Sequence, residues 1–169
     1  MRVEESTLKR FLRTSLVAGV IILGLASLLV HPFGAVKAHT SANLLLAGAV
    51  VDSETVQILE RSCQNCHSEK TDWPWYSYVA PVSWLVENDV HKARSHMNLS
   101  GWDQYSLEEK QDRLAEVAAA VRSRQMPPPR YTLMHRNARL SQPEQERIYQ
   151  WARGERRRLK LLTDRTPNP

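Results

Sequence analysis

The stretch SCQNCHSEK, residues 62–70, most constrains what this chain can fold into. It holds Cys63, Cys66 and His67, and the 169-residue chain has no other cysteine. Two cysteines are too few to staple a small fold with disulfides. Their placement, with two residues between them and a histidine directly behind, therefore predicts a local chemical site instead of a cross-linked scaffold.

Three kinds of site use such a spacing. A disulfide redox pair needs a thiol of lowered pKa, usually at a helix N-terminus after a strand, whereas this pair follows a predicted helix. Zinc needs four ligands in a tetrahedron, and no second C-x-x-C or H-x-x-x-H is present to complete the set. In C-x-x-C-H, two thiols add across the vinyl groups of haem and the adjacent imidazole binds the iron. The sequence favours this third reading, with one covalently attached haem c per chain on Cys63 and Cys66 and with His67 as proximal ligand.

Met126 is the candidate for the sixth iron ligand. It follows a predicted helix and stands directly before three prolines at 127–129, which can hold a sulfur with little flexible chain to order. A thioether favours Fe(II) and suits an electron carrier. Core packing or surface exposure is the ordinary role of a methionine and stays open. Other candidate ligands are His91, His96, His135, Met97 and Met134. An open sixth site, with His135 or His96 as acid or base, would suit a peroxidase or a gas or redox sensor.

Residues 1–38 predict a membrane anchor or signal segment. The run 16–30, LVAGVIILGLASLLV, has no charge, and Arg10 and Arg13 stand just before it. With two flanking residues the run is at the lower limit for spanning a bilayer, and cations on the near side keep that end in the cytoplasm. A secretory signal cleaved after 36–38 is the alternative. We expect the domain on the periplasmic side of a bacterial inner membrane, or secreted to the periplasm if the leader is cleaved.

The remaining chain is predicted to form a connector over 39–50, a helical domain over 51–162 and a flexible tail over 163–169. Strand signals are weak, so the fold class is all-α. Three helix starts carry capping residues, at Asp52 or Ser53, at Ser106 with Glu109, and at Ser141 with Glu144. Helices are expected from about 53 to 61, 82 to 96, 107 to 124 and 142 to 160. The prolines predict a stiff extended loop over 125–135.

Aromatic residues gather just after the cysteine pair. The segment 73–84 holds three of the five tryptophans and two of the five tyrosines. Such rings either form an ordinary core or shield a haem from water. The net charge of +5 includes a basic run at 153–160, read as a solvated helix end. No basic stripe with interleaved aromatics is present, so nucleic acid is not an expected partner.

The order of short motifs resembles the bacterial haem-binding domain proteins, a small family of c-type cytochrome-like proteins. The resemblance covers about 62–152 and rests on C63-Q-N-C66-H67-S, T71-D-W-P-W-Y-S77, P81-V-S-W-L, N98-L-S-G-W102, M126-P-P and L140-S. It implies a cytochrome c-like helical domain, covalent haem c and a membrane-tethered or secreted setting, and it implies no particular reaction.

Together these features favour a membrane-tethered, single-haem electron carrier over an enzyme. The membrane is reached through the N-terminal helix, and a redox protein of unspecified identity is the partner. The alternatives are a haem peroxidase or sensor, and an extracytoplasmic thiol oxidoreductase without haem.

Overall fold

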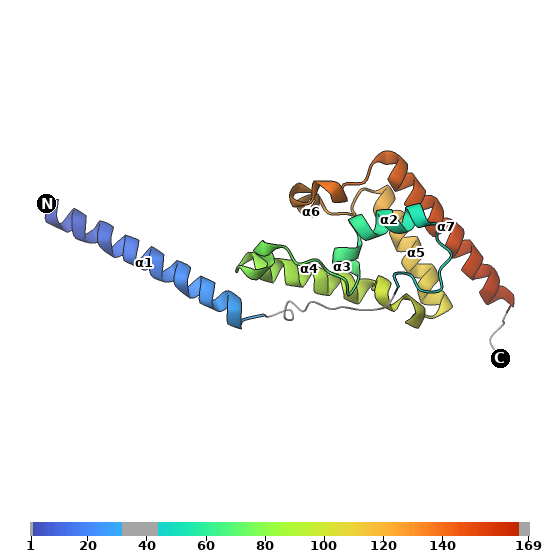
Figure 1. The fold of residues 1–169 in the computed structure, drawn as a ribbon, viewed down its shortest axis with the longest axis horizontal. Coiled ribbons are helices and arrows are strands. Elements are labelled where there is room, and N and C mark those ends of the chain that lie inside the picture. Colours follow the sequence, from blue (N-terminus) through green and yellow to red (C-terminus); the bar gives the residue numbers. More distant parts are fainter. Residues whose placement is uncertain (1, 32–43, 166–169) are drawn as a thin grey trace. The chain divides into compact units, whose positions relative to one another are not determined.

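The structure, a computed structural model, describes residues 2–31 and 44–165. These residues form helices, and they contain no strand, which confirms the all-helical class. In chain order the elements are α1 (Arg2–Leu29), α2 (Ser53–Ser62), α3 (Gln64–His67), η1 (Trp75–Tyr78), α4 (Val82–His96), η2 (Leu99–Gln104), α5 (Leu107–Arg122), α6 (Pro129–Met134), η3 (Arg136–Ala138) and α7 (Gln142–Arg165) (Figure 1).

The chain divides into two compact units. The first comprises 1–37 and 73–92, and the second comprises 38–72 and 93–169. The site predicted from the cysteine pair and Met126 lies in the second unit. The aromatic segment lies in the first, together with α1.

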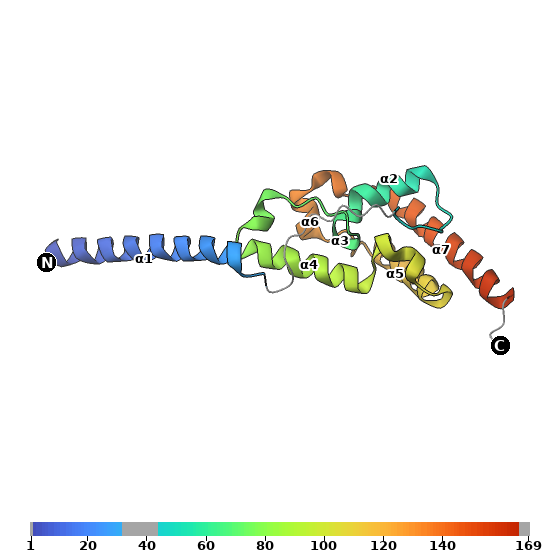
Figure 2. The same cartoon turned by 60° about the horizontal axis from the view of Figure 1, so that its bottom comes forward.

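The core of the second unit forms where α5 and α7 lie side by side, as both views show (Figures 1 and 2). Ile148 and Ala152 of α7 are fully buried, and Leu114 of α5 is 1% exposed. Trp102 of η2 is buried beside them in the same cluster. Burial of apolar surface is the main force that holds such a pair of helices together.

The predicted helix starts are confirmed. The Asp52 side chain accepts a hydrogen bond from the Thr55 amide, and Ser106 with Glu109 forms a reciprocal capping box at α5. At α7 the Ser141 amide donates to Glu144 at 2.8 Å, and the Glu144 amide donates back to the Ser141 hydroxyl at 3.4 Å. These contacts satisfy amides that would otherwise lack partners in the first helical turn.

Helix α2 lies against α7 through polar contacts as well as apolar ones. Arg61 pairs with Glu144 at 2.7 Å, and Arg147 pairs with Glu54 at 2.9 Å. Because Arg61 sits in the last turn of α2, its ion pair fixes the end of the helix that leads directly into Cys63.

Two boundaries differ from the prediction. Leu46, inside the expected connector, is 3% exposed and belongs to the core, and its amide donates to the Leu99 carbonyl at 2.9 Å. The compact part therefore begins before residue 51. Helix α7 continues to Arg165, into the expected flexible tail, and residues 32–43 and 166–169 lie outside the described part.

The extended loop expected over 125–135 is wrong in its second half. Helix α6 begins at Pro129, the third proline, with Pro128 in extended conformation before it. A proline lacks the amide that the first helical turn does not need, so it opens a helix as readily as it blocks one. The first two prolines lie between helices α5 and α6, and the third begins α6.

In the first unit, hydrogen bonds tie the residues that follow α1 to α4. The Trp84 indole donates to the Val30 carbonyl at 2.8 Å, and His31 Nδ1 lies 2.7 Å from the Glu87 carboxylate. The apolar side chains of α1 from Leu16 to Leu25 are exposed. Within the described residues, no helix meets the combined length and hydropathy required to cross a membrane.

Truncation of the buried isoleucine tests this core. We expect Ile148→Ala to lower the free energy of unfolding by about 2–5 kcal/mol, because the lost transfer energy adds to a cavity that cannot fully collapse. Leu161→Ala in the same helix, where the side chain is 59% exposed, should change it by about 0.5 kcal/mol or less. Urea denaturation followed by circular dichroism measures both, and equal effects would contradict the assigned core.

Candidate haem site

The cysteine motif forms a single tight turn at the end of α2. The Cys63 amide still donates to the Leu59 carbonyl of α2 at 2.8 Å. The Cys63 carbonyl in turn accepts from the amides of Cys66 and His67, at 3.2 and 3.0 Å. Residue 63 therefore both ends α2 and begins the short helix α3. All three functional side chains are partly buried.

A hydrogen bond to the backbone orients the His67 ring. Its Nδ1 lies 3.1 Å from the carbonyl oxygen of Met97. Because a carbonyl can only accept, Nδ1 carries the proton, and the neutral ring keeps its lone pair on Nε2. Burial lowers the pKa of His67, opposed by this hydrogen bond, so the ring favours the neutral form that a metal requires. An oriented imidazole with Nε2 as donor atom is suited to bind haem iron.

The thiols are poor candidates for disulfide exchange. No disulfide joins Cys63 and Cys66. Burial, reinforced by the nearby Cys66 sulfur, raises the pKa of Cys63 to about 12. Catalytic redox thiols instead have lowered pKa values that favour the thiolate. The raised pKa of Cys63 therefore disfavours the thiol oxidoreductase predicted as an alternative.

A chain of hydrogen bonds closes the backbone around the motif. The Thr71 hydroxyl donates to the Asn65 carbonyl at 2.7 Å. The Arg94 guanidinium donates to that hydroxyl at 2.8 Å and to the Ser68 carbonyl at 2.8 Å. We call Asn65, Ser68, Thr71 and Arg94 the polar clamp. Burial lowers the pKa of Arg94, although the nearby Glu69 raises it.

The polar clamp also reaches the segment that follows the prolines. The side-chain nitrogen of Asn65 donates to the Tyr131 hydroxyl at 3.0 Å. The side-chain oxygen of Asn65 accepts from the backbone amide of Asp72 at 3.1 Å. Tyr131 belongs to α6, and its ring stacks on that of His135 with centroids 4.3 Å apart. A residue between the two cysteines therefore fixes the element that follows the candidate distal loop.

Met126 lies in the loop between α5 and α6, with 41% of its surface exposed. The Ala120 carbonyl accepts from the amides of Gln125 and Met126, at 2.9 and 3.4 Å.

The other predicted ligands have different surroundings. His96 is 65% exposed and lies 3.2 Å from Glu116. Met97 is buried in the core, and its backbone oxygen, not its sulfur, serves His67. Met134 is 61% exposed, and His91 is exposed in the first unit. Within the described residues no group of three or more His, Cys, Asp or Glu side chains gathers as a metal cluster.

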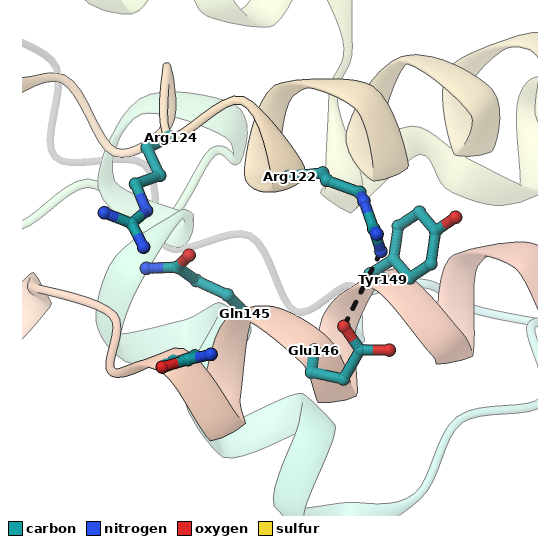
Figure 3. A pocket seen from close by; sticks show the side chains of 6 residues that line it. Arg122, Arg124, Gln145, Glu146 and Tyr149 are labelled. Carbon is teal, nitrogen blue, oxygen red and sulfur yellow. Dashed lines mark ion pairs between the residues drawn. The ribbon is translucent and has the colours of Figure 1, made fainter.

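A surface pocket of about 230 Å³ lies between the end of α5 and the start of α7 (Figure 3). Arg122 pairs with Glu146 at 3.8 Å and stands 4.6 Å from the centre of the Tyr149 ring. The pocket contains none of the motif residues, and its volume is below the usual range for ligand sites of about 300–1,000 Å³. It is therefore separate from the candidate haem site.

Comparison with known proteins identifies the family. Residues 22–154 match the haem-binding domain. The chain belongs to the haem-binding domain family. The predicted family is thus confirmed, and the protein binds haem. It is also 26% identical over 126 residues to cytochrome c peroxidase Ccp of Escherichia coli (strain K12). That match covers 72% of this chain but only 27% of the peroxidase, and no solved structure matches the chain.

The motif of this haem-binding domain was predicted from the sequence, but the residues that support it were not. Asn65, Thr71, Arg94 and Tyr131 were missed, as was the Met97 carbonyl. The available signal was the polar run that directly follows His67, because polar residues beside a buried motif usually make specific hydrogen bonds.

Removal of one phenolic oxygen tests the link to α6. We expect Tyr131→Phe to lower the free energy of unfolding by about 0.5–1.5 kcal/mol, since it deprives the Asn65 amide of its acceptor. Amide hydrogen exchange of residues 130–135, which follow the prolines, should become faster. Tyr78→Phe, at a half-exposed ring, is the control. If both variants leave the exchange of 130–135 unchanged, the Asn65–Tyr131 bond does not hold this segment.

Proposed function

We propose that this haem-binding domain carries one haem c, attached through thioether bonds to Cys63 and Cys66, and works as a single-haem electron carrier. His67 would bind the iron on one side and Met126 on the other. The observation that carries the proposal is the hydrogen bond from His67 Nδ1 to the Met97 carbonyl, which leaves Nε2 as the donor atom next to two cysteines that form no disulfide.

When bound, the haem supplies a one-electron couple between Fe(II) and Fe(III). The chain's own part is to hold the ligands still, so that little rearrangement accompanies a change of charge. Three features supply this rigidity: the turn from Cys63 to His67, the Met97 carbonyl and the polar clamp. The half-buried Arg94 cation, fixed by two hydrogen bonds, would favour an added electron nearby.

We further propose that α1 holds the domain at the periplasmic face of a bacterial inner membrane. Support comes from the exposed apolar side chains of α1 and from the cations Arg10 and Arg13 before them. Thioether formation fits an extracytoplasmic setting, and a cleaved leader would instead release the domain to the periplasm. The domain would exchange electrons with a redox protein at this membrane surface.

A peroxidase-like reaction is the second candidate. The resemblance to cytochrome c peroxidase Ccp supports it, and so does the 41% exposure of Met126, which suits a weak or displaceable sixth ligand. In this reading His135 or His96 would move protons on the distal side. Both functions use the same proximal residues, so the sixth ligand distinguishes them.

Covalent attachment is tested by removing both thiols. We expect wild-type protein, expressed with a c-type cytochrome maturation system, to keep haem stain on a denaturing gel and to gain the mass of one haem. The double variant Cys63→Ala/Cys66→Ala should lose both signals, because the vinyl groups have no sulfur to join. Gln64→Ala, which lies between the cysteines, is the matched control and should keep the stain. A wild-type mass equal to that of the bare polypeptide would contradict the proposal.

Absorbance of the ferric protein separates carrier from peroxidase. For a carrier we expect a sulfur-to-iron charge-transfer band that Met126→Ala abolishes and that Met134→Ala, at a 61% exposed side chain, retains. The loss should convert the haem to high spin, since the strong sixth ligand is gone. A wild-type protein that is already high spin, and that Met126→Ala leaves unchanged, would favour the peroxidase.

A further inference from the structure

The first unit presents an exposed, charge-free apolar surface that the haem site does not use. We define the apolar turn as the strongly exposed residues of η1, of the turn that follows it and of the start of α4. They are Trp75 at 77%, Tyr78 at 51%, Val79 at 48%, Val82 at 43% and Leu85 at 49%. Exposed apolar patches of this kind mark contacts with a partner protein or a membrane.

The charge pattern around the apolar turn is that of a lipid-facing surface. From residue 73 to residue 86 the sequence contains no charged side chain. The next charged residue, Glu87, is 2% exposed and faces His31 at 2.7 Å. The segment that carries the apolar turn therefore supplies no charged side chain of its own, whereas the rim of a protein interface is usually polar.

The apolar turn is also tied to the end of α1. The Trp84 indole donates to the Val30 carbonyl, and His31 contacts Glu87, so two bonds join the chain just after α1 to the first turns of α4. The side chains of α1 from Leu16 to Leu25 are themselves exposed and apolar. When α1 is inserted in lipid as proposed, the apolar turn therefore lies close to the point at which the chain leaves the membrane.

The residue types match this position. Tryptophan and tyrosine concentrate at the boundary between acyl chains and headgroups, where a ring has an apolar body and a polar edge. Val82 and Leu85 are spaced to share one face of α4. We propose that the apolar turn lies in the headgroup region of the phospholipid bilayer and orients the domain on the membrane. This inference rests on the proposed attachment through α1.

Photocrosslinking in membranes tests the inference. The full-length holoprotein is inserted into vesicles of phosphatidylethanolamine and phosphatidylglycerol, with p-benzoylphenylalanine replacing Trp75. The same replacement at Phe11 of α1, 66% exposed, reports on attachment. Replacement at Leu133 of α6, 69% exposed in the second unit, is the matched control. The haem spectrum of each variant verifies folding.

We expect phospholipid adducts by mass spectrometry at positions 75 and 11, and none at 133. Adducts at 11 but not at 75 would overturn the inference and keep the proposed attachment; crosslinks from 75 to protein would then identify a partner chain or a second copy. An altered haem spectrum confined to the position-75 variant, without a lipid adduct, would assign the apolar turn to the haem and also overturn it. Lipid adducts at none of the three positions would overturn attachment and inference together.

Discussion

The candidate site depends on one hydrogen bond, from the His67 ring to the Met97 carbonyl. That carbonyl is itself firmly held. The Met97 amide closes the last turn of α4 by donating to Ala93 at 2.8 Å, and its side chain is buried in the core of the second unit. Two residues on, the Leu99 carbonyl accepts from the amide of Leu46. The hydrophobic core therefore orients the imidazole through the backbone carbonyl of Met97. This orientation leaves Nε2 as the ring atom available for binding.

A second constraint is the polarity of the segment that follows the histidine. Residues 68–72 contain no large apolar side chain, so burial contributes little to their order. Fixing each residue costs about 1–2 kcal/mol of backbone entropy at room temperature. The polar clamp opposes this cost with several directed bonds, of which those from Arg94 involve a charged donor and are the stronger kind. Rigidity beside the haem motif thus comes from hydrogen bonds, and rigidity of the surrounding helices comes from packing.

The sequence predicted features that depend on local chemistry. The helix starts at Asp52, Ser106 and Ser141 follow from side chains that reach amides within three residues, and such contacts are visible in the sequence. The role of the Met97 carbonyl was not predictable, because every residue has a backbone carbonyl and the sequence does not indicate which donor it binds. Leu46 was missed because its burial depends on elements distant in sequence. Helix α6 was missed because consecutive prolines were read as loop residues alone, although the last of them opens a helix.

The proximal side of the site is compatible with both an electron carrier and a peroxidase, so the difference must arise on the distal side. There the chain provides a short loop held at one end by hydrogen bonds to Ala120 and, beyond the prolines, by the bond between Asn65 and Tyr131. The second bond originates inside the cysteine motif, so the proximal turn and the distal loop share a support. A loop fixed at both ends would keep the Met126 sulfur at a constant distance from the iron of the proposed site. The exposure of the Met126 side chain instead favours its replacement by solvent as a ligand. In the proposed site, the balance between these two properties would determine whether Met126 stays bound to the iron or gives way to a substrate.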